Sequence, residues 1–213
     1  MNTPSRWKSA ELRLDCMRKL LIATHNNKKF TELKSLLRST DFDLVSLRDI
    51  GIIEEVDETG TTFEENACLK AKGYLQLSGL PTLADDSGLE VQALNWEPGV
   101  YSARYGGPSA SDQDRIELVL QNLAQSNDQN RSAQFRCVVA IAFSDHSLEV
   151  YNGICTGEIT TIPRGENGFG YDSIFLIPHL NKTLAELTSE EKNKISHRSA
   201  ALSQAAEVLQ NSG

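Results

Sequence analysis

Short apolar runs alternate along the chain with segments whose apolar residues recur at helical spacing. Residues 19–23 form the first apolar run and predict a β-strand. A polar loop follows, and Phe30, Leu33 and Leu37 then lie on one face of a predicted helix. Residues 43–47 predict a second strand. This succession of strand, loop, helix and strand is typical of an α/β fold.

Three further helical segments are predicted from apolar stripes and capping signals. One begins at about Thr62 and ends at residues 79–81, which read Gly-Leu-Pro. Capping boxes formed by Ser111 with Asp114 and by Thr188 with Glu191 begin the other two. Their stripes comprise Phe63, Ala67, Ala71 and Tyr74, then Ile116, Val119, Leu120 and Leu123, then Ile195, Leu202, Ala206 and Leu209.

Three more strands are predicted in the second half of the chain. Residues 135–143 are almost continuously apolar, as expected of a strand buried on both faces. A short polar turn joins them to residues 148–156, so we expect a β-hairpin. Residues 173–178 predict another strand.

The most distinctive stretch is the apolar run from Thr82, which leads into Asp85-Asp86-Ser87-Gly88. If it is a parallel strand, the two carboxylates lie where the strand ends, and the ligand crevice of an open α/β sheet lies at that edge. This favours metal-assisted chemistry. The alternative is that Asp-Ser-Gly only forms a turn, because Asp and Ser bond their own backbone and Gly tolerates positive φ.

Two polar connections are candidates for binding charged groups. Residues 24–29, Thr-His-Asn-Asn-Lys-Lys, begin a helix, where free N–H groups and the positive end of the dipole attract anions. The loop lacks the glycines of a Walker loop, and the alternative is an ordinary solvated helix start. Residues 52–61 carry Glu54, Glu55, Asp57 and Glu58, which either form a solvated loop or include one or two residues that face a cation.

Two later segments complete the set of candidates. Residues 163–172 contain three glycines around Phe169 and Tyr171, which either stack on a planar ring or pack into the core. The first turns of the C-terminal helical region carry Lys192, Lys194, His197 and Arg198, which form either a ligand-binding cluster or a hydrated helix face. Carboxylates, two basic clusters and an aromatic loop together match the requirements of a magnesium nucleotide.

Composition and charge narrow the possible partners. The 213 residues suit one domain, or two small lobes around one core, and we expect residues 1–18 to form a frayed extension, with Met17 as an alternative start. The net charge of −8 argues against duplex nucleic acid, and no apolar run is long enough for a membrane span. The four cysteines have no paired spacing, which favours reduced thiols and the cytosol.

Six ordered motifs resemble those of the inosine triphosphate pyrophosphatase family, and the resemblance extends from about Lys19 to Leu209. The motifs are residues 24–29 with Glu32, 62–67, 84–89, 98–105, 168–172 and 196–198. The resemblance implies an elongated mixed α/β fold with two lobes around a deep cleft, usually as a homodimer. It also implies Mg²⁺-dependent hydrolysis of deaminated purine nucleoside triphosphates, namely ITP, dITP and XTP, to the monophosphate and pyrophosphate.

The same resemblance assigns roles to individual residues. Asp86 corresponds to the proton acceptor and a magnesium ligand, and Asp57 is a second candidate ligand, although the family often has glutamate there and Glu58 is adjacent. Ser87 is implied to touch the substrate. The residues implied to bind the triphosphate are Thr24, His25, Asn26, Asn27, Lys28, Lys29 and Lys70. Those implied to form the base and sugar pocket are Phe169, Gly170, Tyr171, Asp172, Lys192, His197 and Arg198.

Two other functions remain open at this stage. A Maf-like nucleotide pyrophosphatase would share the fold class but prefer other modified triphosphates. A non-catalytic nucleotide sensor would use Asp86 as a metal ligand without turnover. For the hydrolase, selection of inosine over adenosine requires donors to the 6-keto oxygen, and His197 and Arg198 are the available ones.

Overall fold

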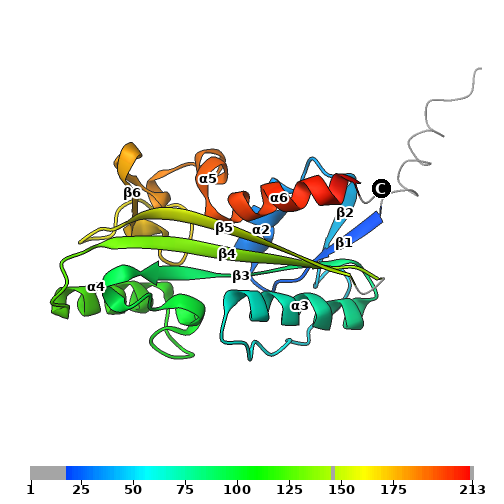
Figure 1. Cartoon of the computed structure of the whole chain (residues 1–213), viewed down its shortest axis with the longest axis horizontal. Helices are drawn as coiled ribbons and strands as arrows, with labels where there is room; N and C mark the ends of the chain where they lie inside the picture. The colour runs from blue at the N-terminus through cyan, green and yellow to red at the C-terminus, as the bar shows by residue number, and fades with distance from the viewer. Residues whose placement is uncertain (1–17, 145–146, 212–213) are drawn as a thin grey trace, which may run out of the picture.

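The computed structural model describes residues 18–144 and 147–211, which form one seven-stranded mixed sheet with helices on both faces (Figure 1). The strand order is β2-β1-β3-β4-β5-β6-β7. The strands are β1 Arg18–Ile22, β2 Phe42–Ser46, β3 Thr82–Val91, β4 Ser132–Ala142, β5 Leu148–Ile159, β6 Phe175–Ile177 and β7 Lys182–Thr183. The predicted α/β class and elongated mixed sheet are confirmed. The extension predicted for residues 1–18 lies almost wholly outside the described residues, and β1 already begins at Arg18.

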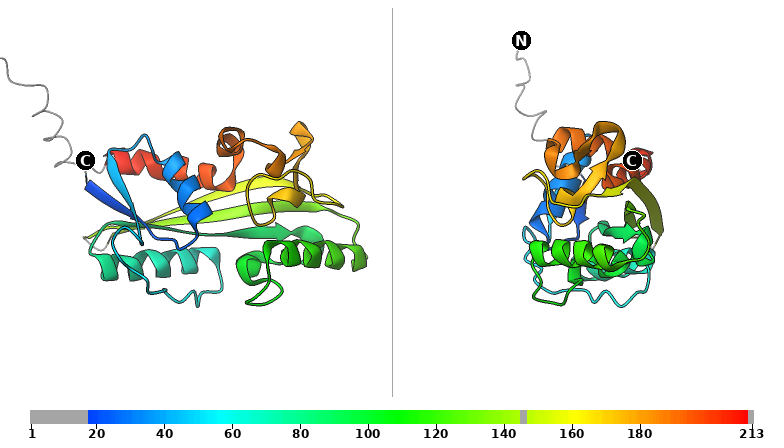
Figure 2. Two further views of the ribbon diagram at one scale, coloured as in Figure 1. Left: turned by 180° about the vertical axis from the view of Figure 1, so that it is seen from behind. Right: turned by 90° about the vertical axis from the view of Figure 1, so that its left-hand side faces the viewer.

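The helices form a layer on each side of the long strands β3, β4 and β5. In the orientation of Figure 1, α3 and α4 lie below the sheet, whereas α2, α5 and α6 lie above it, and Figure 2 shows the same layers from two other sides. The helices are α2 Asn27–Leu36, α3 Phe63–Ser78, α4 Asp112–Gln125, α5 Ser189–Ile195 and α6 His197–Asn211. Five short 3₁₀-helices connect them within the described chain, namely η1 Gln92–Leu94, η2 Gly99–Arg104, η3 Asp172–Ile174, η4 Pro178–Leu180 and η5 Leu184–Glu186.

The helix boundaries follow the local signals in the sequence. The predicted capping boxes are present, since Ser111 with Asp114 begins α4 and Thr188 with Glu191 begins α5. A third capping box joins Thr62 to Glu65 at the start of α3, and Gly79 ends that helix in the left-handed conformation. Each cap satisfies backbone groups that the first or last turn leaves unpaired.

The core is divided between the two ends of the molecule. At one end, the part of the sheet around β1 packs against α2 and α6 on one face and against α3 on the other. At the other end, the far parts of β3, β4 and β5 pack with α4 and with the segment from Tyr171 to Leu187. This division corresponds to the expected two lobes.

The Asp85-Asp86 pair lies inside β3, so neither the predicted strand end nor the alternative turn is correct. β3 pairs in parallel with β1 only at Thr82 and Leu83, after which β1 ends. Pairing with β4 continues in antiparallel register over the whole strand, with Asp85 opposite Val139 and Asp86 opposite Val138. The carboxylates therefore lie beyond the carboxyl end of β1, while β4 keeps β3 extended.

Two glycines let other segments approach the sheet closely. A Cβ on Gly88 would collide with the carbonyl oxygen of Gly99 and the hydroxyl of Ser102, so the glycine allows η2 to pack directly on β3. A Cβ on Gly153 would collide with the carbonyl oxygen of His197, so this glycine allows the start of α6 to lie against β5. These close approaches place Ser102 of η2 and His197 of α6 next to the sheet, where both line the cleft that is described below.

The remaining strand predictions are close to the observed elements. The β4–β5 hairpin is present, and β5 extends to Ile159. The strand predicted from Ser173 is shorter, because residues 172–174 form η3 before β6 begins. Within the described part of the chain, no helix has the length and apolar character needed to cross a bilayer.

Candidate active site

A cleft of about 160 Å³ lies between the two lobes and brings together residues from eight separate segments. Its walls come from the start of α2, the acidic loop at residues 52–61, the centre of β3, η2, the start of α4, β4, the loop at residues 169–172 and the start of α6. Residues from the sequence prediction that line it are Asn26, Lys29, Asp86, Ser87, Phe169, Gly170, Tyr171, Asp172, His197 and Arg198. Glu58, Ser102 and Asp112 also line it.

Asp86 lies in a buried cluster at the α3 side of the cleft. Its side chain accepts a hydrogen bond from Nδ2 of Asn66 at 3.2 Å, and Nζ of Lys70 lies 3.7 Å from its other oxygen. Lys70 also pairs with Glu58 at 3.0 Å. Burial raises the pKa of Asp86, and Lys70 offsets this only in part. A carboxylate with a raised pKa is a better proton acceptor near neutral pH than an ordinary aspartate.

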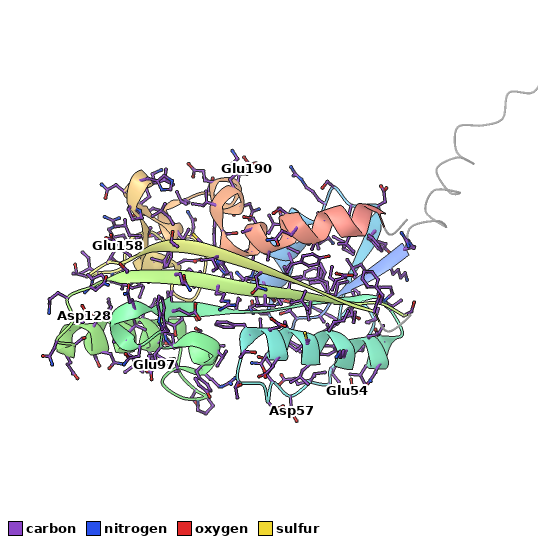
Figure 3. The ribbon with its side chains drawn as sticks, in the orientation of Figure 1. Glu54, Asp57, Glu97, Asp128, Glu158 and Glu190 are labelled. Carbon is purple, nitrogen blue, oxygen red and sulfur yellow. The ribbon has the colours of Figure 1, made fainter. Side chains whose placement is uncertain are left out.

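The two candidate metal ligands in the acidic loop differ in position. Glu58 lines the cleft with Asp86, whereas Asp57 is exposed, and Figure 3 shows it at the outer edge of the molecule beyond α3. In residues 18–144 and 147–211, no three His, Cys, Asp or Glu side chains converge as a complete metal cage. Two carboxylates nevertheless fit Mg²⁺, which is usually held by one or two carboxylates together with substrate phosphates.

The loop at residues 24–29 uses two of its polar side chains to form the start of α2. Asn26 accepts from the backbone N–H groups of Lys28 and Lys29, at 2.9 and 3.1 Å, and its own N–H donates to Oγ1 of Thr24. His25 lies on the other side of the loop, with Nε2 3.2 Å from the carbonyl oxygen of Glu54. Asn27 and Lys28 are exposed. The positive charge of this loop is therefore carried by Lys28, which is exposed, and by Lys29, which lines the cleft.

Lys192 and Arg198 form a buried network and His197 is also buried, so the alternative of a hydrated helix face is wrong for these three residues, whereas Lys194 is exposed as that alternative expects. Nζ of Lys192 lies 2.7 Å from Glu32 and 2.6 Å from Asp172. The guanidinium of Arg198 donates to Glu32 at 2.8 Å, to Oγ of Ser87 at 2.8 Å and to Asp85 at 3.3 Å. Only 4% of Arg198 is exposed, so these partners fix its position.

The two aromatic residues of the loop at 169–172 have different environments. Tyr171 is buried, and its hydroxyl donates to the carbonyl oxygen of Ser102 at 2.9 Å. Phe169 is only partly buried, and its ring centroid lies 5.0 Å from Nζ of Lys192 and 5.3 Å from the guanidinium of Arg198. Nζ of Lys28 lies 5.9 Å from the same centroid. Packing in the core is therefore correct for Tyr171, while Phe169 presents a ring to the cleft beside three cations.

His197 is buried against the sheet and uncharged. Its ring stacks on Phe135 with centroids 4.8 Å apart, and its Nδ1 is buried without a partner among the described residues. Burial lowers the pKa of His197 well below 6.5, and the positive charge of Arg198 lowers it further. A neutral imidazole offers one donor and one acceptor to a ligand.

Several residues of the site had no role assigned from the sequence. Glu32 was part of a motif, but its position between Lys192 and Arg198 depends on residues about 160 positions later in the chain. Asn66 touches Asp86, and Ser102 and Asp112 contact the aromatic loop. No local pattern identifies such contacts, since each joins segments that only the fold brings together.

The fold and the site define a mixed α/β protein whose cleft combines buried carboxylates with lysine and arginine side chains. Comparison with known proteins identifies the group. The model of the Ham1 family matches residues 20–208. The chain belongs to the Ham1 family, which confirms the family resemblance drawn from the motifs.

Curated relatives and solved structures agree with this assignment. The chain is 46% identical over 194 residues to the dITP/XTP pyrophosphatase of Bacillus subtilis (strain 168), covering 91% of this chain and 98% of that protein. It is 44% identical to the dITP/XTP pyrophosphatase of Coxiella burnetii, covering 91% and 97%. The structure of a HAM1 protein from Coxiella burnetii superposes with a TM-score of 0.84 at 43% identity, covering 92% of this chain and all of that one. The Staphylococcus aureus Ham1 protein gives 0.82 at 41% identity, again with 92% of this chain covered.

Proposed function

We propose that this protein hydrolyses the deaminated purine nucleoside triphosphates ITP, dITP and XTP to the monophosphate and pyrophosphate. The observation that carries the proposal is the cleft, in which Asp86 and Glu58, both in contact with Lys70, lie opposite a buried cationic wall and an accessible aromatic ring. The names of the relatives from Bacillus subtilis and Coxiella burnetii, dITP/XTP pyrophosphatases, support the same activity. Removal of these nucleotides would keep them out of nucleic acid.

In the proposed reaction, Asp86 accepts a proton from the water that attacks the α-phosphorus. The new bond forms between the water oxygen and this phosphorus, and the bond to the bridging oxygen of pyrophosphate breaks. Lys29, which lines the cleft, and Lys70, whose Nζ lies 3.7 Å from Asp86, stabilise the negative charge that develops on the phosphate oxygens. We place the remaining triphosphate contacts at the start of α2, from Thr24 to Lys28.

We propose Mg²⁺ as the metal, with Asp86 and Glu58 as its protein ligands in place of Asp57. When bound, the ion would neutralise phosphate oxygens and favour pyrophosphate as the leaving group. Glu58 fits this role because it lines the cleft and shares Lys70 with Asp86. Asn66 supports the arrangement, since it donates to Asp86 and accepts from the N–H of Gly60 in the same acidic loop.

Recognition of the base is assigned to the opposite wall. Phe169 would stack on the purine, and the cations beside it have N–H donors that the protein itself does not use. Arg198 uses three of its five N–H donors on Asp85, Glu32 and Ser87, so two remain for a keto oxygen. With the neutral His197, these groups favour the 6-keto oxygen of inosine and xanthosine over the 6-amino group of adenosine.

Pyrophosphate release from ITP, XTP, ATP and GTP, each with Mg²⁺ and with chelator, tests the proposal. We expect Mg²⁺-dependent release from ITP and XTP only, and its loss in Asp86→Asn. Modified pyrimidine triphosphates complete the panel, and release confined to them would indicate the Maf-like alternative. Nucleotide binding without release from any substrate would indicate a sensor.

The assembly and cellular compartment are further proposals. We propose a homodimer, as the family resemblance implies, and light scattering coupled to gel filtration measures it directly. We also propose that the protein works in the cytosol. The free thiols of Cys68, Cys137 and Cys155 support a reducing compartment.

A further inference from the structure

Two hydrogen bonds join the aromatic loop, which comprises residues 169–172, to α4 and η2 across the cleft. The backbone N–H of Gly170 donates to Oδ2 of Asp112 at 2.9 Å, between residues 58 positions apart in the sequence. The hydroxyl of Tyr171 donates to the carbonyl oxygen of Ser102 at 2.9 Å, between residues 69 positions apart. The loop is therefore held by η2 and α4 on one side, while its cationic partners lie on α2, α5 and α6.

Asp112 is itself fixed in position. It is the first residue of α4, where the positive end of the helix dipole favours a carboxylate. Its other oxygen, Oδ1, pairs with the guanidinium of Arg115. Arg115 in turn donates to the carbonyl oxygens of Ala103 at 2.9 Å and Ala110 at 2.7 Å. The carboxylate is thus anchored to a helix and to the segment that follows η2.

The position of Gly170 determines where its neighbours lie. Gly170 has a φ of 59°, a left-handed conformation that suits glycine, and it lies between Phe169 and Tyr171, which both line the cleft. Phe169 then faces Lys192 and Arg198, and Asp172 contacts Lys192 at 2.6 Å. The N–H of Phe169 itself donates to Asp172 at 2.9 Å, so two successive backbone hydrogen bonds hold the ring, and loss of the acceptor of Gly170 would remove one of them.

We propose that Asp112 is a positioning residue for nucleotide binding, which holds Gly170 and thereby orients Phe169 for stacking on the base. This inference rests on the proposed function, because it assigns the base to Phe169. Asp112 acts through the loop and contributes to binding of the nucleotide, while the phosphate chemistry takes place at Asp86. Replacement of Asp112 by a residue that cannot accept this hydrogen bond should therefore raise KM and leave kcat almost unaltered.

Three variants separate this role from simple stabilisation of the helix. Asp112→Ala removes the acceptor, and we expect KM for ITP to rise about tenfold with kcat within about twofold of the wild type. Asp112→Asn keeps a carbonyl oxygen for the N–H of Gly170, so its KM should return close to the wild-type value. Asp114→Ala is the matched control, because Asp114 lies in the same turn and bonds Ser111 at the helix cap without touching the loop.

Amide hydrogen exchange gives a readout that does not depend on turnover. The peptide containing Gly170 should exchange faster in Asp112→Ala than in the wild type, Asp112→Asn or Asp114→Ala. Tyr171→Phe removes the second cross-cleft bond, so it should raise KM in the same direction and serves if Asp112→Ala fails to fold.

Several outcomes would overturn the inference. Equal increases in KM for Asp112→Ala and Asp114→Ala would show that only helix stability matters. A fall in kcat without a change in KM would assign Asp112 to the chemical step. A wild-type protein that releases no pyrophosphate from ITP refutes the proposed function, whereas an active wild type with an unaltered Asp112→Ala refutes only the positioning role.

Discussion

Asp85 and Asp86 are neighbours on β3, yet they face opposite sides of the sheet and have opposite electrostatic environments. Asp85 lies on the side of α2 and α6, 3.3 Å from both Lys29 and Arg198. Burial alone would raise its pKa, but these two cations outweigh burial and hold the pKa well below its usual range. Asp86 lies on the side of α3, where burial outweighs Lys70 and its pKa is raised.

The difference indicates that the two faces of β3 have different roles, one structural and one chemical. On the side of α2 and α6, permanently charged groups compensate each other and form a rigid wall with Ser87 and Arg198. On the side of α3, a carboxylate with a raised pKa is available to accept a proton. Successive side chains of a strand alternate between faces, so one residue of shift is enough to separate the two roles.

The largest expected effect is on turnover in Asp86→Asn. We expect kcat for ITP to fall by about 10²–10⁴-fold, because a positioned general base contributes this much. The free energy of unfolding measured in urea with chelator should stay the same or rise at pH 7, since the substitution removes a buried carboxylate that the fold disfavours. Turnover near the wild-type level would show that Asp86 is not the proton acceptor, and the proposed difference in role between the two aspartates would be wrong.

Asp85→Asn should have its main effect on stability. Removing one partner from a buried charge network typically costs about 3–5 kcal/mol, and here Lys29 and Arg198 each lose an anionic partner, while Arg198 keeps Glu32. Urea unfolding measures this loss. Glu158→Gln, at an exposed position on β5, is the control and should change stability by no more than about 0.5 kcal/mol. If both variants were equally stable, Asp85 would not hold the cationic wall together.

Base selection should depend on the side of α2 and α6. His197→Ala should lower kcat/KM for ITP about tenfold and leave the residual hydrolysis of ATP almost unchanged, since one hydrogen bond to the 6-keto oxygen is lost. Parallel measurements with both nucleotides test this. An equal fall for ITP and ATP would show that His197 does not discriminate between the bases.

A further expected effect is a pH dependence of stability that comes from His197. Its pKa in the folded protein lies well below 6.5, so the unfolded chain binds more protons once the pH falls below 6.5. This residue therefore contributes stability above pH 6.5 that is lost on acidification, by up to ~1.4 kcal/mol per pH unit. The loss between pH 7 and pH 5 should be smaller in His197→Gln, and an identical loss in both proteins would contradict the neutral assignment.

The sequence by itself determined the local features of this protein. Apolar spacing and capping residues predicted the main helices and strands, because a helix cap or an amphipathic face is formed by residues that lie close together in the sequence. The ordered motifs also indicated the family, which the comparisons confirm over residues 20–208. Most of the candidate site residues could be named in this way before their positions were known.

Only the tertiary structure decided how those residues work together. It placed Asp85 and Asp86 within β3 instead of at its end, because β4 keeps β3 extended after β1 stops. It brought Glu58 to the cleft while Asp57 faces outward. It also joined Asp112 to Gly170, a contact between segments 58 residues apart. Such pairings depend on how sheet and helices pack, and packing is a property of the whole chain that no short stretch of sequence contains.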